Sequence, residues 1–238
     1  MNISEIIGDA IAYPLHNVKS LVIFVILGII AALIGGTAVI GLITAANSQG
    51  VSGFALSGVG IIGFIIFILL IFLIEGYALD IVKYGIERRD DGPVIDFARQ
   101  ISNAIKLIIV DFVYYIVPSI IIFLLGIFLK DWLITIISLI LLIVFALANF
   151  MARCRLAKSD SLGEALAIGE AIGDISRVGL GKLIATVIIV FVIALIIVFI
   201  VGVITNINQY LGNIILGIAI VYLIFFYHRV IGLLYSDA

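Results

Sequence analysis

The chain has 238 residues, of which 65% are hydrophobic and 12% are charged, and its mean hydropathy is +1.41. This composition excludes a water-soluble globular domain and indicates an integral membrane protein. The formal net charge of −2 carries little information about partners. We expect contact with the lipid bilayer and no nucleic acid partner.

The first predicted element is an amphipathic helix that ends just before Lys19. One face of it carries Ile3, Ile6, Ile7, Ala10, Ile11, Leu15 and Val18. Residues 20–74 then contain no Asp, Glu, Lys, Arg or His. A crossing needs about 20 apolar residues, so this stretch predicts two spans, with a turn at residues 47–50. Gly28, Ala32 and Gly36 predict a small-residue stripe on the first span, where another helix can approach closely.

The second predicted unit begins with an amphipathic helix over residues 93–105, for which Pro93 suits the first turn. Two shorter apolar runs follow at 112–129 and 132–152. In the third unit, Ser161 and Glu164 have the spacing of a capping box at the start of an amphipathic helix. Residues 183–227 again lack ionisable side chains and predict two spans, with a turn at 206–209.

These elements recur three times along the chain. Lys19, Lys106 and Lys182 each precede a predicted hairpin, and Lys106 to Arg153 and Lys182 to Arg229 are both separations of 47 residues. An acidic residue also lies 10, 10 and 8 residues before these lysines, at Asp9, Asp96 and Asp174 respectively. The spacing predicts one membrane domain over residues 1–238, with repeat units at about 1–85, 86–157 and 158–238. The expected fold is all-α: six transmembrane helices form three hairpins, each preceded by an amphipathic cytoplasmic or interfacial helix.

The basic residues predict the orientation. With six spans, twelve of the 13 Lys and Arg residues lie on one side and only Lys130 lies on the other. The positive-inside rule then places both termini in the cytoplasm, and we expect the protein in the plasma membrane. Lys19, Lys106, Lys182, Arg153 and Arg229 are interpreted as cytoplasmic anchors of the hairpins. Two separated histidines and one cysteine form no metal-binding pattern, so we predict no metal and no cofactor.

Asp111 is the main candidate for a functional side chain, because it lies about one turn inside the third span. It could be a proton or cation site, or it could pair with Lys106, Arg153 or Lys182 at the cytoplasmic edge. Glu75, near the end of the second span, has the same two interpretations. Tyr115 and Pro118, in the same span as Asp111, are further candidates for functional or structural intramembrane residues, and Pro118 should kink that helix.

Several of these residues fall in a pattern that resembles a known family. They are Gly76-Tyr77 to Gly85, Asp91-Gly92-Pro93, Asp96 and Tyr115-Ile-Val-Pro118. The pattern is similar to that of the archaeal and bacterial multi-pass membrane proteins called domain of unknown function 4013. The chain departs from it at Ser102-Asn103, where the family pattern has Asp-Gly. The resemblance implies an archaeal membrane protein and assigns no activity.

Three classes of function remain open from the sequence. A non-enzymatic scaffold, partner-binding or envelope-associated membrane component is favoured, because the spans offer few convergent polar groups. Its partner could be another membrane protein or a second copy of the chain. A transporter or channel for a small solute, lipid or ion is the alternative, using Asp111 and the Pro118 kink. No catalytic residues can be assembled within a span, so we do not expect an enzyme.

Overall fold

Every element in the computed structural model, which describes residues 1–46 and 50–238, is a helix. The bounds are α1 (Ile3–His16), α2 (Val18–Ala46), α3 (Gly50–Ile86), α4 (Phe97–Gly126), α5 (Asp131–Ser159), α6 (Leu162–Ala165), α7 (Ile168–Val178), α8 (Leu180–Ile207) and α9 (Gln209–Tyr235). Among the described residues, six helices are long and apolar enough to cross a membrane. The prediction of an all-helical chain with six such helices is confirmed. The turn predicted at residues 47–50 falls at 47–49 outside the described residues.

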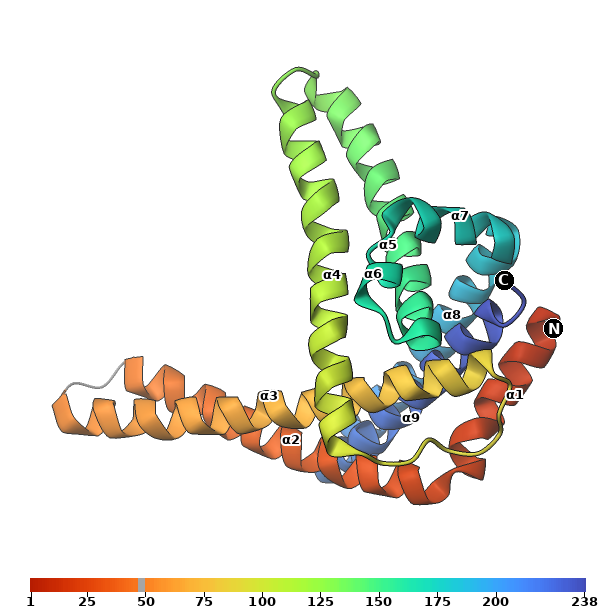
Figure 1. The fold of residues 1–238 in the computed structure, drawn as a ribbon. Coiled ribbons are helices and arrows are strands. Elements are labelled where there is room, and N and C mark those ends of the chain that lie inside the picture. Colours follow the sequence, from red (N-terminus) through yellow and green to blue (C-terminus); the bar gives the residue numbers. More distant parts are fainter. Residues whose placement is uncertain (47–49) are drawn as a thin grey trace.

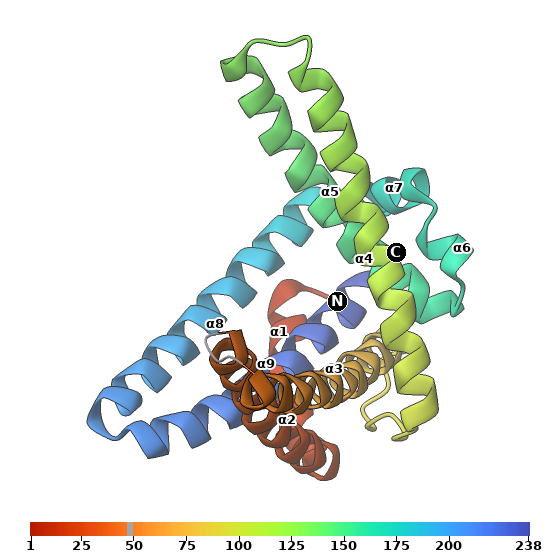
Figure 2. The same cartoon turned by 90° about the vertical axis from the view of Figure 1, so that its left-hand side faces the viewer.

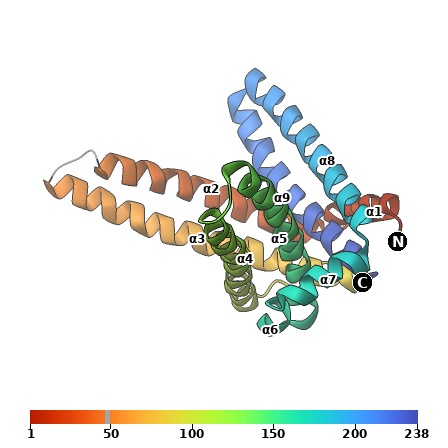
Figure 3. The same cartoon turned by 90° about the horizontal axis from the view of Figure 1, so that it is seen from above.

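The six long helices form three consecutive pairs that point away from one another. α2 packs along α3, α4 packs against α5, and α8 meets α9 (Figure 1). Figure 2 shows α8 and α9 joined at their outer ends and diverging inward. In the view from above, the α2–α3 pair and the α8–α9 pair extend in different directions from the part of the molecule where they meet, while α4 and α5 point toward the viewer (Figure 3).

The three pairs meet at one junction, near which both chain ends lie (Figure 1). We call this junction the hub. It consists of α1, α6, α7 and the inner parts of four long helices, at residues 76–86, 97–110, 148–159 and 221–235. Most of the fully buried side chains belong to it, so the core of the molecule lies at the hub and not along the outer parts of the pairs.

The junctions before Lys19, Lys106 and Lys182 differ from one another, which the repeat did not predict. α1 ends at Asn17, whose side chain donates to the carbonyl oxygen of Tyr13 at 3.0 Å, and α2 begins at the next residue. α7 ends at Gly179, whose φ of 92° is in the left-handed region that favours glycine. No such residue precedes Lys106, so the predicted amphipathic segment is continuous with the span and both form α4. That helix also begins later than Pro93, because the Asp96 side chain caps it by accepting from the Arg99 backbone N–H at 3.2 Å.

The small-residue stripe on α2 lies one position away from the predicted one. Gly28 does face a neighbour, since a Cβ there would be 3.1 Å from Val221 of α9. The face that contacts α3 carries Ala31, Gly35 and Ala38, all of which are buried. Ala32 and Gly36 are exposed, so the predicted Gly28, Ala32 and Gly36 stripe is wrong at two positions. α2 packs against two helices, α3 and α9. The spacing of small residues shows that a close-packing face exists, but it does not show which side of α2 faces α3 and which faces α9.

Close backbone contacts hold the inner ends of the helices together. A Cβ on Gly76 of α3 would collide with the backbone carbonyl of Gln100 on α4. Gly85 of α3 and Gly232 of α9 cross so tightly that a Cβ on Gly85 would be 2.9 Å from the Cα of Gly232. Tyr77 fills the space beside these crossings, with its ring stacked on Phe24 at a centroid distance of 4.2 Å. Glycine is therefore required at these two crossings for close approach.

An ion pair joins each pair of predicted repeat units within the hub. Between the first and third units, Arg229 Nε donates to Asp9 Oδ1 at 2.7 Å. Between the second and third units, Arg155 Nη1 donates to Asp174 Oδ2 at 3.1 Å. Between the first and second units, Arg99 Nη2 lies 3.0 Å from Asp80 Oδ2. Arg229 is 1% exposed, which places this residue inside the core of the hub.

Candidate functional site

A cavity of about 400 Å³ lies between the inner parts of α3, α4, α5 and α9. Apolar side chains form most of its wall, and besides the hydroxyl of Tyr227 four groups bring polar chemistry into it: Glu75, Asp111, Arg153 and His228. All four lie on helices that are apolar enough to cross a membrane. Ionisable groups at such positions are costly to bury and mark functional sites or structural pairs. The cavity is therefore the first candidate for a functional site.

Asp111 is bound by Arg153 through two hydrogen bonds. Arg153 Nε donates to Asp111 Oδ1 at 3.0 Å, and Arg153 Nη2 donates to Asp111 Oδ2 at 2.6 Å. This bidentate geometry is the strongest form of carboxylate–guanidinium pair, and it links α4 to α5. The other two predicted partners of Asp111, Lys106 and Lys182, form ion pairs with other carboxylates. Lys106 lies 2.5 Å from Asp160 and Lys182 lies 2.9 Å from Asp237.

Glu75 carries the uncompensated charge of the cavity. It makes no hydrogen bond or ion pair with any residue that the structure describes, although it is close enough to Arg153 and Asp111 to interact with both electrostatically. Because Asp111 already neutralises Arg153, the half-buried Glu75 carboxylate is left without a counter-charge of its own. Sequence reasoning favoured Asp111 over Glu75; in the structure Asp111 is the paired acid, and Glu75 is the acid without a described partner.

His228 completes the polar wall. It is 6% exposed, and its Nδ1 lies 2.8 Å from the backbone carbonyl oxygen of Ile224. A carbonyl oxygen can only accept, so Nδ1 must carry the proton and, in the neutral ring, Nε2 is an acceptor. Nothing in the sequence indicates that His228 would share a cavity with Glu75.

Tyr115 and Pro118 do not belong to this cavity. Tyr115 is 61% exposed on α4, and Pro118 is buried further along the same helix. α4 continues through Pro118 as one helix, and the hydroxyl of Ser119 donates to the carbonyl oxygen of Tyr115 at 2.7 Å. The neighbouring Tyr114, which sequence reasoning did not single out, donates to the Ala165 carbonyl at 3.0 Å and so ties α4 to α6.

Among the residues that the structure describes, no three His, Cys, Asp or Glu side chains are grouped to hold a metal ion. Cys154 is fully buried in the hub core. The ionisable groups that line the cavity can exchange protons, pair with opposite charges and bind a cationic group.

The sequence of α3 to α8 matches a family described as "Protein of unknown function (DUF4013)", over residues 59–206. The chain belongs to this family. In the cavity of this DUF4013 protein, Glu75, Asp111 and Arg153 lie within the matched range, and Tyr227 and His228 lie beyond it. No curated protein and no solved structure matches the chain.

The residues by which the chain resembles DUF4013 proteins have structural roles in the hub. Gly76 and Gly85 lie at the two helix crossings, and Tyr77 donates its hydroxyl to the Pro93 carbonyl at 3.2 Å. Asp96 caps α4. These roles explain why the pattern needs those residue types, and they identify no activity.

Proposed function

We propose that this DUF4013 protein is a non-enzymatic membrane scaffold, whose hub holds three transmembrane hairpins apart so that other transmembrane helices bind between them. The observation that carries the proposal is how little the spans bury one another. In the most apolar 18-residue stretch of each span, the buried share ranges from 6% for α8 to 39% for α9. Helices that enclose a transport path bury their flanks against one another, whereas these flanks are free for lipid or protein.

The proposed topology has both termini in the cytoplasm and the hub on the cytoplasmic side of the plasma membrane. The asymmetry of the Lys and Arg residues supports this orientation. The ion pairs of Asp9, Asp174 and Asp80 support the threefold repeat, because each links a different pair of units. Two of these acids, Asp9 and Asp174, are also the ones that precede the unit-opening lysines.

Site-specific photo-crosslinking in native membranes tests the scaffold proposal. A photoreactive residue is placed at Phe199, which is 73% exposed on α8, and as a control at Leu183, which is fully buried on the same helix. We expect a protein adduct of one discrete mass from position 199 and none from position 183. Light scattering of the protein in mild detergent gives the mass of the assembly. A solitary monomer whose adducts at 199 are all lipid would overturn the proposal.

A second candidate function, transport of a proton or small cation, is favoured by one observation. Glu75 has a carboxylate without a described partner in a cavity between three helix pairs. If this function is right, Glu75→Gln abolishes a cation-dependent or proton-dependent flux in proteoliposomes. The control is Asp131→Asn, which changes an exposed carboxylate at the start of α5. An unchanged flux in Glu75→Gln excludes the role of this residue.

A further inference from the structure

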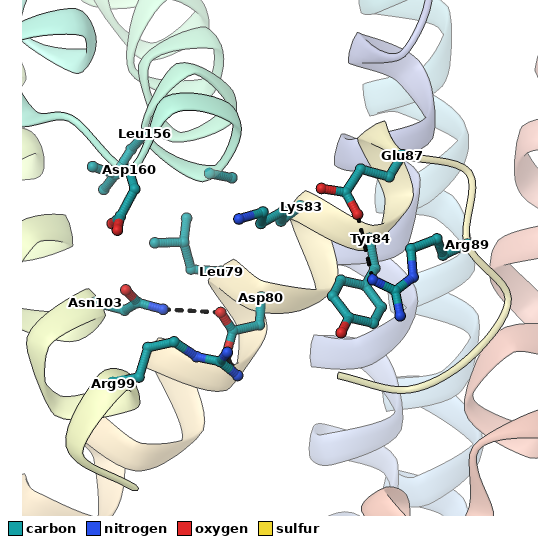
Figure 4. A pocket seen from close by; sticks show the side chains of 11 residues that line it. Leu79, Asp80, Lys83, Tyr84, Glu87, Arg89, Arg99, Asn103, Leu156 and Asp160 are labelled. Carbon is teal, nitrogen blue, oxygen red and sulfur yellow. Dashed lines mark hydrogen bonds and ion pairs between the residues drawn. The ribbon is translucent and has the colours of Figure 1, made fainter. Parts of the chain in front are cut away.

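A second cavity, of about 250 Å³, opens at the hub between the last turns of α3, the first turns of α4 and the end of α5. Unlike the intramembrane cavity, it is lined mainly by charged and polar side chains (Figure 4). It lies where α3, α4 and α5 begin or end their apolar spans, which corresponds to the level of the lipid headgroups.

Each acidic group of this cavity already has a basic partner. Asp80 is paired with Arg99 at 3.0 Å and accepts from Asn103 Nδ2 at 3.1 Å. Asp160 is paired with Lys106 at 2.5 Å. Glu87 lies 3.7 Å from Arg89. Each carboxylate of the wall therefore has an ion-pair partner other than Lys83, although Lys83 is close enough to Asp80 to interact with it electrostatically.

Lys83 is the cation that remains. It makes no hydrogen bond or ion pair with any described residue, and Figure 4 shows its side chain extending from α3 into the cavity toward α5. Tyr84 is next to it, and its ring is fixed by the guanidinium of Arg89, which lies 3.8 Å from the ring centroid. The Tyr84 hydroxyl also makes no hydrogen bond within the described chain, but its ring extends from α3 away from the Lys83 side chain (Figure 4).

We propose that this cavity binds one phosphate-bearing group through Lys83. An ammonium group in a polar cavity binds phosphate as a point charge. The group can belong to an anionic lipid headgroup or to a small soluble phosphate compound, since both present the same oxygens. Basic pockets between transmembrane helices at the cytoplasmic surface hold anionic headgroups by this chemistry.

The test uses the full chain in maltoside detergent, which contains no phosphate. The melting temperature is followed with a thiol-reactive dye, because the single cysteine, Cys154, is buried and reacts when the hub opens. Phosphatidylglycerol and inorganic phosphate are titrated separately, against chloride at equal ionic strength. We expect at least one of them to raise the melting temperature. A rise with phosphatidylglycerol alone identifies a lipid headgroup, and a rise with inorganic phosphate identifies a soluble compound.

Lys83→Met should weaken this response about tenfold, because it removes one charge-assisted bond. The variant should fold, since Lys83 makes no bond within the described chain. Lys83→Arg, which keeps the charge, should bind, and it tests the proposal if Lys83→Met does not fold. Lys19→Met is the matched control, because Lys19 is exposed, lies on the same predicted side and does not line the cavity. The proposal is overturned if the melting temperature of the wild-type protein rises with neither anion. It is also overturned if Lys83→Met responds like the wild type, or if Lys83→Arg folds and does not respond.

Discussion

The two acids of the intramembrane cavity show what a single position can and cannot reveal. The cost of a carboxylate in a span predicted that Asp111 would be paired or functional, and Arg153 was among the partners considered. The two-pronged bond from Arg153 depends on how α4 and α5 pack, which single-residue arguments cannot supply. The isolation of Glu75 was not predictable either, because it follows from Arg153 being engaged.

We therefore expect opposite stability effects at these two positions. Asp111→Asn leaves the Arg153 guanidinium without its counter-charge in a part-buried site and should lower the unfolding free energy by about 1–3 kcal/mol. Glu75→Gln removes an uncompensated charge and should leave stability unchanged or raise it. Both variants can be compared by the rate at which Cys154 becomes reactive on heating. Equal destabilisation by the two substitutions would contradict the assignment of Arg153 to Asp111.

Asp237 provides a prediction about pH. The N-terminal ammonium at 2.8 Å and Lys182 at 2.9 Å lower the pKa of this carboxyl to about 2. A lowered pKa contributes stability that is present above the ordinary pKa of about 3.8 and is lost as the pH falls through about 2. The difference in melting temperature between wild type and Asp237→Asn should thus be present at pH 7 and vanish near pH 2. A difference that does not depend on pH would show that the pairing contributes nothing.

At the scale of elements, the sequence predicted the long helices well and the way they begin and meet less well. Apolar length alone determines a span, so all six were predictable. The helix break before α2 depends on Asn17, and the break before α8 depends on Gly179. α4 contains no such residue before Lys106, so the amphipathic segment and the span form one helix. Ser102-Asn103, the departure from the family pattern, supplies a contact that no pattern showed. Asn103 Nδ2 donates to Asp80 and, at 3.3 Å, to the Gly76 carbonyl.

The crossing of α3 and α4 should be intolerant of any side chain at its centre. Gly76→Ala places a methyl group against the Gln100 backbone and should destabilise the protein by about 1–3 kcal/mol through overpacking. Gly36→Ala is the matched control, because nothing lies within 4 Å of a Cβ there. Thermal unfolding of the two variants checks this. If Gly76→Ala unfolds like Gly36→Ala, the close approach of α3 and α4 is incorrect.

At the scale of the whole molecule, the bias of basic residues predicts a hub on the cytoplasmic side, and this orientation stays a prediction. The pairing of units through acids was not predicted. The recurring Asp9 and Asp174 were visible in the sequence, but their partners Arg229 and Arg155 belong to other units and are 220 and 19 residues away. Partners at such separations are brought together by the arrangement of the three pairs, which local spacing does not encode.

Labelling from each side of the membrane tests the orientation. Lys130→Cys, between α4 and α5 at their outer ends, and Lys158→Cys, near the end of α5 in the hub, are made in a Cys154→Ala background. In intact cells without an outer barrier, a membrane-impermeant maleimide should label position 130 and should label position 158 only after lysis. Labelling of position 158 first would reverse the topology.

The pair of Asp9 and the buried Arg229 also sets an order of events during biosynthesis. A ribosome delivers the chain from its N-terminus, so Asp9 emerges 220 residues before the arginine that will neutralise it. Contacts of such long sequence separation form late. The earlier hairpins must therefore persist in the membrane with an unfinished junction until α9 is inserted. Quality-control proteases would meet an open junction in any chain that stalls before Arg229, and this makes the last helix a checkpoint for the whole fold.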